Sequence, residues 1–497
     1  MRGTLLSVAP FIPLGLIALH MFTRQGHAKL AAWTQSLFGL FLAALALPSF
    51  VSDAPRVAVD GFSMMITGSG TVFKTALYLD ARNSAFVLLL GLCLPIIFVF
   101  IRPRTEVKPS YYISANILIG SLLGVFIANS LLLFYLFWEM ALLGAYFWIG
   151  LHGQRREDTP ALYTALMRFV LITLFGSLPM LMAIAIVILP SGDVALADLG
   201  RSISILSPEL RGLAFWGFLL GFGVKLPLVG LHGWLRDTYA VAPPACRALL
   251  SAIMSKMGAY GLLIVLVPAF GSEFGTWGPT LMAVAAAGAI YGGVVCLGRD
   301  RLTDVLAYSS LAHLSLVALA AFAGTRGDAS DSSAITAGIF QVFNHGLIMA
   351  FLFALDDRIS VDGRGILMSE VGGLRAGQGR LTALMLVAMF AAASLPGLSN
   401  FAGEILVYFA AFRVSPWYTF AAGAGALITA AAMIRIFHHL FFGARRGNVV
   451  QAADLRIPEV ALGLAVVSVW LVLGLYPMLF VGPVERAFAT VVAGVVP

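Results

Sequence analysis

The sequence predicts an all-α, polytopic membrane protein with about fourteen transmembrane helices. Its mean hydropathy is +0.94, 60% of its 497 residues are hydrophobic and only 11% are charged. A soluble domain carries about 25% charged residues, and roughly 20 consecutive apolar residues span a bilayer as a helix. No polar stretch is long enough for a separate extramembrane domain. The net charge of +7 therefore reflects membrane topology and does not indicate nucleic-acid binding.

Fourteen apolar segments of spanning length follow one another along the chain. The third is short and could begin earlier, and the loop after the second is expected to hold a β-ribbon or an interfacial helix. The predicted spans are Leu5–Phe22, Leu30–Phe50, Phe86–Ile101, Tyr111–Ala128, Leu131–Leu151, Ala161–Leu189, Leu213–Leu235, Ala245–Val267, Leu281–Leu297, Val305–Ala323, Ile335–Leu355, Leu381–Phe412, Trp417–Phe442 and Val460–Val481.

Two of these spans carry helix-breaking residues. Lys225 lies two residues before Pro227 in the seventh span, and Ser394-Leu395-Pro396-Gly397 interrupts the twelfth, which is too long for one straight helix. Breaks five spans apart predict two five-helix repeats that lie inverted in the membrane, as in many transporters. The predicted organisation is 1–109 for helices 1–3, 110–268 for the first repeat, 274–443 for the second and 444–497 for the last helix.

Lysine and arginine in the loops predict the orientation. Loops after odd-numbered spans hold 17 of these residues and the opposite side, termini included, holds 9. Because positive loops stay in the cytoplasm, we expect both termini to face the periplasm.

Seven charged residues interrupt the apolar spans. Charged groups inside a membrane are expensive and mark ion or proton pathways more often than not. The two acids are Glu139 and Glu404, and the five basic residues are Arg168, Lys225, Arg247, Lys256 and Arg435.

A proton relay is the interpretation that these residues favour. Glu139 and Lys225 are expected to form a pair, because a nearby cation keeps a buried carboxylate ionised. Lys256 and Glu404 would continue the relay. The alternative is a set of structural ion pairs that hold helices together.

The histidines and two arginines are weaker candidates. His313 and His345 lie in spans ten and eleven, and histidine can bridge proton donors near neutral pH. His232 follows Lys225 by seven residues and shares its helix face if the helix continues. Arg435 is a candidate proton outlet, and for Arg168 a role in ordering loop or helix contacts is favoured over a role in the relay.

No cofactor motif accompanies these charges. The three cysteines, Cys93, Cys246 and Cys296, have no metal-site spacing, and the sequence has no nucleotide-binding loop or haem motif. We therefore expect no redox centre and no metal in this chain.

An ordered set of motifs resembles a known family. The segments are FWE with Glu139, GVKLPLVGLHGWL with Lys225 and His232, KMGAYG with Lys256, LAYSSLAH with His313, and LPGLSNFAGE with Glu404. Together they resemble the antiporter-like subunits of respiratory complex I, NADH:quinone oxidoreductase, and above all its M subunit, called subunit 4 in mitochondria. The resemblance runs from about Phe62 to the C-terminus.

The resemblance implies roles for these residues. In that family the FWE glutamate and the lysine of the first broken helix form the input pair, here Glu139 and Lys225. The lysine of KMG, Lys256, is the central relay. The glutamate after LPG, Glu404, is the output residue, and a glutamate there points to the M subunit or to its relatives among Mrp sodium/proton antiporters.

Some positions depart from the family pattern HxWLPDAHxxAPT. Arg236 stands in place of proline, Tyr239 of histidine and Pro244 of threonine. Arg301-Leu302-Thr303-Asp304 replaces the usual DLKR, and Ser130 takes the place of an aspartate.

The resemblance also implies partners and location. FMN, iron–sulfur clusters and quinone are expected in partner subunits, and L- and N-type antiporter-like subunits are expected beside this chain in a bacterial inner membrane. The alternatives are an Mrp-type cation/proton antiporter subunit and the membrane subunit of an energy-converting hydrogenase.

The charge asymmetry makes a testable prediction about topology. The loops with Arg155–Arg156 and Arg445–Arg446 should be cytoplasmic. Cysteines placed there should escape a membrane-impermeant maleimide added to intact cells and react after the membrane is opened. Strong labelling of either loop in intact cells would reverse the orientation.

Overall fold

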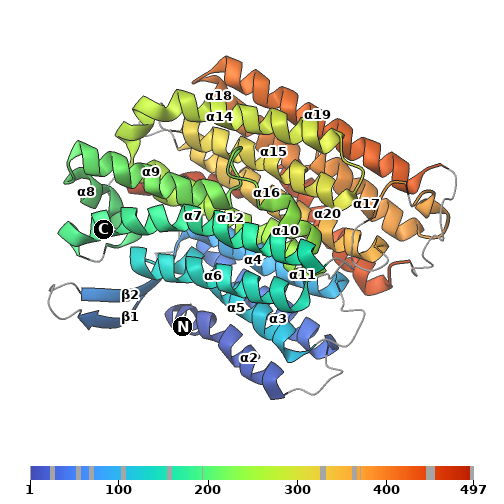
Figure 1. Ribbon diagram of the computed structural model, residues 1–497, viewed down its shortest axis with the longest axis horizontal. Helices are drawn as coiled ribbons and strands as arrows, with labels where there is room; N and C mark the ends of the chain where they lie inside the picture. Colours follow the sequence, from blue (N-terminus) through green and yellow to red (C-terminus); the bar gives the residue numbers. More distant parts are fainter. Residues whose placement is uncertain are drawn as a thin grey trace.

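The computed structural model is almost entirely helical, with the long helices lying side by side (Figure 1). It describes residues 2–22, 28–51, 57–65, 72–101, 108–153, 159–192, 194–324, 332–360, 366–369, 371–443 and 454–492.

The helices follow the predicted order. They are α1 (Arg2–Val8), α2 (Ile12–Phe22), α3 (Ala28–Val51), α4 (Ala81–Phe100), α5 (Pro109–Ile127), α6 (Leu131–His152), α7 (Thr159–Ser191), α8 (Leu199–Ser204), α9 (Pro208–Lys225), α10 (Leu235–Val241), α11 (Pro244–Leu249), α12 (Ser255–Tyr260), α13 (Val267–Ala269), α14 (Gly271–Leu297), α15 (Leu302–Ala323), α16 (Ser333–Ile359), α17 (Gly379–Ala392), α18 (Ser399–Phe412), α19 (Pro416–Phe441), α20 (Ile457–Leu475) and α21 (Met478–Val492). Short 3₁₀ turns lie at Ala9–Phe11, Leu196–Asp198 and Leu374–Ala376, and π-helical turns at Leu250–Met254 and Gly261–Leu266.

Twelve helices in the described part of the chain are long and apolar enough to cross a membrane. The two remaining predicted spans are the broken ones, α9 with the turns after it, and the pair α17–α18. The chain is thus a multi-pass membrane protein, while the count of fourteen crossings and the inverted repeats stay predictions.

Local capping explains where the third span differs from the expectation. The predicted start was Phe86, but α4 begins at Ala81, because the Asp80 carboxylate accepts hydrogen bonds from the backbone N–H groups of Arg82 and Asn83. The ninth span likewise begins at Gly271, ten residues before the predicted Leu281.

The loop between the second and third spans forms the expected β-ribbon. Strands β1 (Val57–Met65) and β2 (Val72–Leu79) pair antiparallel, and the ribbon lies at the same end of the molecule as α8 (Figure 1). The hydroxyls of Tyr78 in β2 and Tyr260 in α12 lie 2.9 Å apart, which ties the ribbon to the helix of Lys256.

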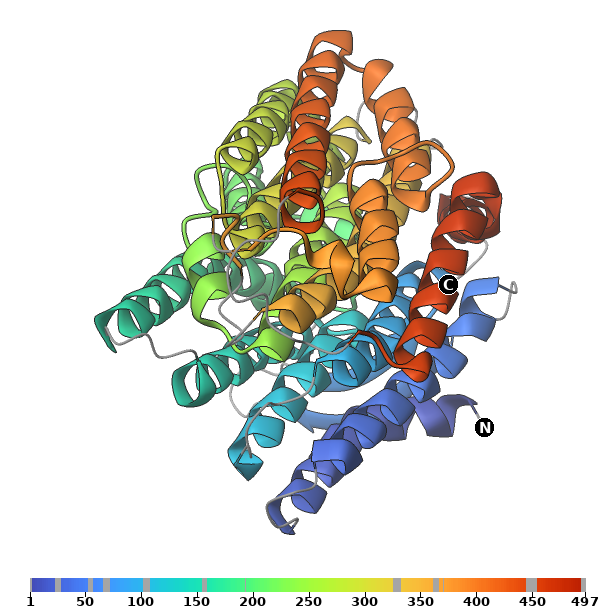
Figure 2. The same cartoon turned by 90° about the vertical axis from the view of Figure 1, so that its right-hand side faces the viewer.

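Helices α15 and α16 form the centre of the bundle. Both are buried along their whole membrane-spanning windows, whereas most of α2 and α20 faces outward. Figure 2 shows the N-terminal helices beside the C-terminal helices, and the rings of Phe50 and Phe480 pack 4.8 Å apart between them. Side chains on α15 and α16 are therefore held away from lipid.

Glycine lets the broken helix approach the helix of Lys256. A Cβ on Gly258 would lie 2.5 Å from both the Leu226 nitrogen and the Phe222 oxygen, which are backbone atoms that cannot turn aside.

The Gly258→Ala variant should therefore lower the free energy of unfolding of the purified protein by about 1–3 kcal/mol. Gly423→Ala is the matched control, since nothing lies within 4 Å of that Cβ. Equal melting of the two variants would contradict the close approach.

Candidate functional site

The first helix break places Lys225 at the last residue of α9. Beyond it Pro227 has a φ of +22° and Gly230 a φ of +90°, so the chain leaves the helix and turns until α10 begins at Leu235. The indole of Trp234 donates to the freed carbonyl of Val224 at 2.9 Å. The predicted interruption beside a buried lysine is confirmed, and Lys225 is only 1% exposed.

Glu139 and Lys225 interact without forming a direct ion pair. The two side chains are close enough for their charges to interact, but no N–O distance within 4.0 Å joins them. Lys225 Nζ lies 5.7 Å from the Trp138 ring centroid and 5.9 Å from that of Phe169, with no hydrogen-bond partner among the described residues. On the side of the carboxylate, Tyr135 lies close to Glu139.

Lys256 lies on the short helix α12, between the two π-helical turns. Such turns are rare and often occur at functional sites. The ammonium is fully buried and lies 2.5 Å from the Ser251 carbonyl oxygen, 3.3 Å from Ser255 Oγ and 2.9 Å from His345 Nδ1. All three partners are uncharged when His345 is neutral.

A line of titratable groups continues from Lys256 across α16 and α15. The ring centroids of His345 and His313 lie 5.6 Å apart. His313 Nδ1 then lies 2.9 Å from Glu404 Oε1, a contact whose angles are not those of a hydrogen bond. The structure thus brings together four predicted site residues that lie up to 148 positions apart in the sequence.

The second helix break holds Glu404. Between α17 and α18, Ser394 adopts a φ of +54° and Gly397 a φ of +93°. The Ser394 hydroxyl donates to Glu404 Oε1 at 2.6 Å, and the Asn400 amide bonds both that hydroxyl and the carboxylate. The break therefore supplies the donors that a carboxylate needs inside a protein.

Three predicted residues lie apart from this line. His232 belongs to the turns after α9, so the helix does not continue to it; its ring packs against Tyr291 at 5.1 Å. Arg168 pairs with Asp237 at 2.5 Å, and Arg435 with Asp300 at 3.3 Å. For these two arginines the geometry is that of partly exposed ion pairs between neighbouring elements of the bundle.

A buried ion pair escaped the sequence analysis. Arg247 Nη1 lies 3.3 Å from Asp356 Oδ2, which also accepts from the Thr303 hydroxyl at 3.0 Å. Asp356 was overlooked because the predicted span ended at Leu355, whereas α16 runs to Ile359. An arginine within a predicted span, such as Arg247, is itself a signal that a buried carboxylate lies close to it.

The cysteines lie on three helices as free buried thiols, Cys93 on α4, Cys246 on α11 and Cys296 on α14. Within the described ranges no group of three or more His, Cys, Asp or Glu side chains could hold a metal ion.

Comparison with known proteins identifies the family. Residues 128–429 match the family described as NADH:quinone oxidoreductase/Mrp antiporter, transmembrane region, and the chain belongs to it. The chain is 30% identical over 509 residues to NADH-quinone oxidoreductase subunit M of Rhodobacter capsulatus, covering 96% of this chain and 95% of that one. It is 28% identical over 457 residues to the subunit of the same name from Escherichia coli K12, with coverages of 90% and 86%.

Solved structures support the same fold. The chain superposes on a chain of respiratory complex I from Thermus thermophilus with a TM-score of 0.83, 27% identity and 99% coverage of both chains. It superposes equally well, with a TM-score of 0.83, on the Mrp complex from Dietzia sp. DQ12-45-1b, covering 99% of this chain and 97% of that one. At 17% identity the second likeness shows the fold alone.

The position of His313 makes a prediction about the line from His345 to Glu404. A His313→Gln variant keeps a polar side chain of similar length but cannot carry a proton, so proton translocation in vesicles should fall by roughly 100-fold. His438→Gln, on the exposed face of α19, is the matched control and should keep wild-type translocation. Normal translocation in His313→Gln with intact assembly would remove His313 from the path.

Proposed function

We propose that the chain is a proton-translocating membrane-arm subunit of a bacterial NADH:quinone oxidoreductase. The single observation that carries the proposal is the line Lys256–His345–His313–Glu404, in which both end contacts are 2.9 Å long. The names of the relatives support it, since both bacterial proteins above are called subunit M.

The geometry of Lys256 suits a group that both accepts and releases a proton. Its ammonium has no carboxylate within ion-pair distance among the described residues, so no permanent counter-charge holds the proton in place. His345 Nδ1, at 2.9 Å, is the acceptor in position. An imidazole can take a proton at one ring nitrogen and release it from the other, which leaves the far nitrogen of His345 to pass the proton on toward His313.

Glu404 is the proposed outlet of the relay. Ser394 and Asn400 hydrogen-bond its Oε1, the same oxygen that His313 approaches, and Tyr408 lies 3.4 Å from Oε2. These donors stabilise the carboxylate once its proton has left. The charge of the His313 ring would then determine when Glu404 accepts the next proton.

Glu139 and Lys225 are the proposed input. The two charges interact without direct contact. A small movement or a change of protonation at one residue therefore alters the proton affinity of the other, and no contact has to break. Lys225 Nζ and Glu139 Oε1 have no hydrogen-bond partner among the described residues, and water is the molecule that commonly supplies hydrogen bonds to such buried polar groups.

The remaining assignments follow the family. Redox chemistry with FMN, iron–sulfur clusters and quinone would take place in partner subunits, and this chain would stand beside L- and N-type antiporter-like subunits. Both termini would face the periplasm, and residues 110–268 and 274–443 would form the inverted repeats.

An Mrp-type cation/proton antiporter subunit is the second candidate, because the family description includes both. The composition of the purified complex separates the two. Flavoprotein and iron–sulfur subunits would indicate an NADH:quinone oxidoreductase, small Mrp subunits an antiporter, and a nickel–iron subunit a hydrogenase.

Substitution of Lys256 tests the relay itself. Arginine keeps the charge but holds its proton permanently, so Lys256→Arg and Lys256→Ala should both reduce proton translocation by roughly 100-fold while the complex still assembles. Quinone-reductase turnover should fall with it if pumping is coupled. Lys108→Arg, at the exposed start of α5, is the matched control. Near-normal translocation in Lys256→Arg would leave Lys256 as a fixed structural charge.

A further inference from the structure

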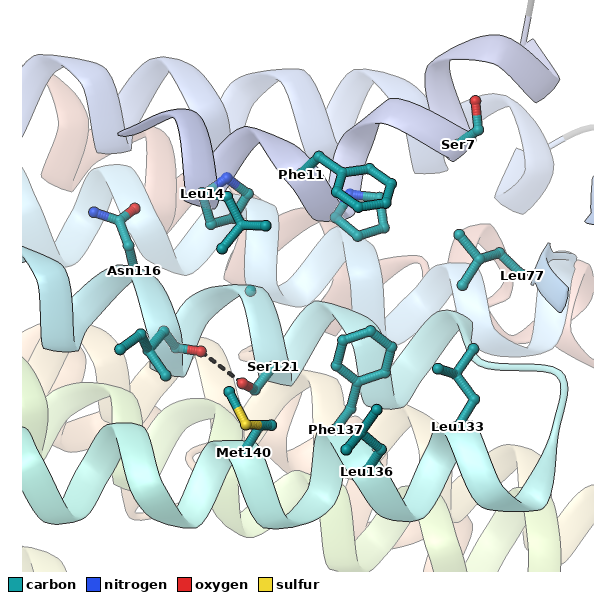
Figure 3. A pocket seen from close by; sticks show the side chains of 14 residues that line it. Ser7, Phe11, Leu14, Leu77, Asn116, Ser121, Leu133, Leu136, Phe137 and Met140 are labelled. Atoms are coloured by element: carbon teal, nitrogen blue, oxygen red, sulfur yellow. Dashed lines mark hydrogen bonds between the residues drawn. The ribbon is translucent and has the colours of Figure 1, made fainter. Parts of the chain in front are cut away.

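We propose that a groove on the membrane-facing side of the N-terminal helices holds one acyl chain of a phospholipid, with the lipid phosphate at Arg2. The groove lies between α1–α2 and α6, with α5 as its floor, and has a volume of about 530 Å³ (Figure 3). No part of the proposed relay lines it.

The sequence of the first span creates this groove. In Ala-Pro-Phe-Ile-Pro, Pro10 and Pro13 lack the N–H groups that continue an α-helix, and a 3₁₀ turn at Ala9–Phe11 separates α1 from α2. Below this bend the floor is Gly120, which has no side chain to fill the space; a Cβ there would lie 3.2 Å from Pro13. The bend and the bare floor leave a channel along the helices.

The lining calls for a hydrocarbon occupant. Its three polar side chains are already bonded within the protein: Ser7 donates to the Thr4 carbonyl, Ser121 to the Ile117 carbonyl and Asn116 to the Tyr112 carbonyl. The Asn116 oxygen also accepts from Gln35 Nε2 at 2.8 Å. The remaining lining is aliphatic or aromatic, so the groove offers an occupant no free hydrogen bond.

Size and direction favour an acyl chain over a partner helix. From Leu133 to Met140, α6 rises about 10 Å, which fits within one leaflet of the ~30 Å hydrocarbon core. At ~30 Å³ for each water-sized group, about 530 Å³ holds at most roughly 18 such groups, no more than the methylenes of one long acyl chain. A helix with side chains is 10–12 Å wide and would exceed this space over the same length.

The groove opens to the lipid phase and ends near a charge. Phe11, Leu14 and Leu136 on its rim are each more than half exposed. At the end marked by Ser7 and Leu77, α1 continues to Arg2, about 7 Å farther along the helix axis. A guanidinium binds a phosphate through two parallel hydrogen bonds, so the head group of a lipid whose chain enters the groove meets a cation.

Photocrosslinking of the purified complex in phosphatidylcholine vesicles tests this site. The probe is phosphatidylglycerol with a diazirine near the end of one acyl chain, and the measurement is mass spectrometry of labelled peptides. Groove residues should be labelled about tenfold more than the exposed face of α19, a preference of about 1.4 kcal/mol that would come from van der Waals contacts of one chain with the groove walls.

Two pairs of variants complete the test. Leu136→Trp should obstruct the groove and remove the preference, whereas Leu143→Trp, two turns along the same face of α6, should keep it. Arg2→Gln should weaken labelling by phosphatidylglycerol, whereas Arg201→Gln, at an exposed position of α8, should not. Uniform labelling of all outward faces, labelling unaffected by Leu136→Trp, or a neighbouring subunit crosslinked into the groove would each overturn the proposal. Unchanged labelling in Arg2→Gln would overturn the placement of the phosphate.

Discussion

The contact between Lys256 and His345 is the interaction on which the interior depends. A charge in hydrocarbon is tolerated only where polar groups surround it and lipid is kept away. The structure meets this requirement by placing both residues on the most deeply buried helices and by giving the ammonium three close partners. Because these partners are uncharged when His345 is neutral, Lys256 is solvated without being fixed in one protonation state.

Irregular backbone makes this solvation possible. A regular α-helix uses its carbonyl groups internally, but the π-helical turns on either side of α12 and the breaks after Lys225 and before Glu404 free backbone and side-chain groups for the site. Ser394, a non-glycine residue with positive φ, is held in a conformation that costs about 1–3 kcal/mol. Its hydroxyl bonds Glu404 directly, so the strained residue and the functional carboxylate belong to one local structure.

Periodicity, charge and proline predicted much of this arrangement, and their limits have physical causes. Pro227 lies among Gly221, Gly223 and Gly230, and Pro396 directly precedes Gly397, so both breaks could be located from sequence. The Lys256–His345 contact depends on how two helices 89 residues apart pack, which no local pattern contains. The expected Glu139–Lys225 pair is not a direct ion pair, because the distance between the two side chains also depends on how their helices pack. His232 would share the helix face of Lys225 only on a continuous helix, and α9 ends at Lys225.

Side-chain contacts in the structure account for several departures from the family pattern. Arg236 and Asp304 come from two different divergent segments, yet Arg236 Nη2 lies 3.1 Å from Asp304 Oδ2 and joins α10 to the start of α15. Thr303, from the second segment, bonds Asp356, the partner of buried Arg247. Ser130, in place of an aspartate, accepts from Leu133 N as the N-cap of α6, a position that serine and aspartate fill equally well. An arginine at 236 without an acid at 304 would lack that partner, so the two divergent segments interact directly in this chain. These divergent residues lie at helix ends and connections, apart from the line that runs from Lys256 to Glu404.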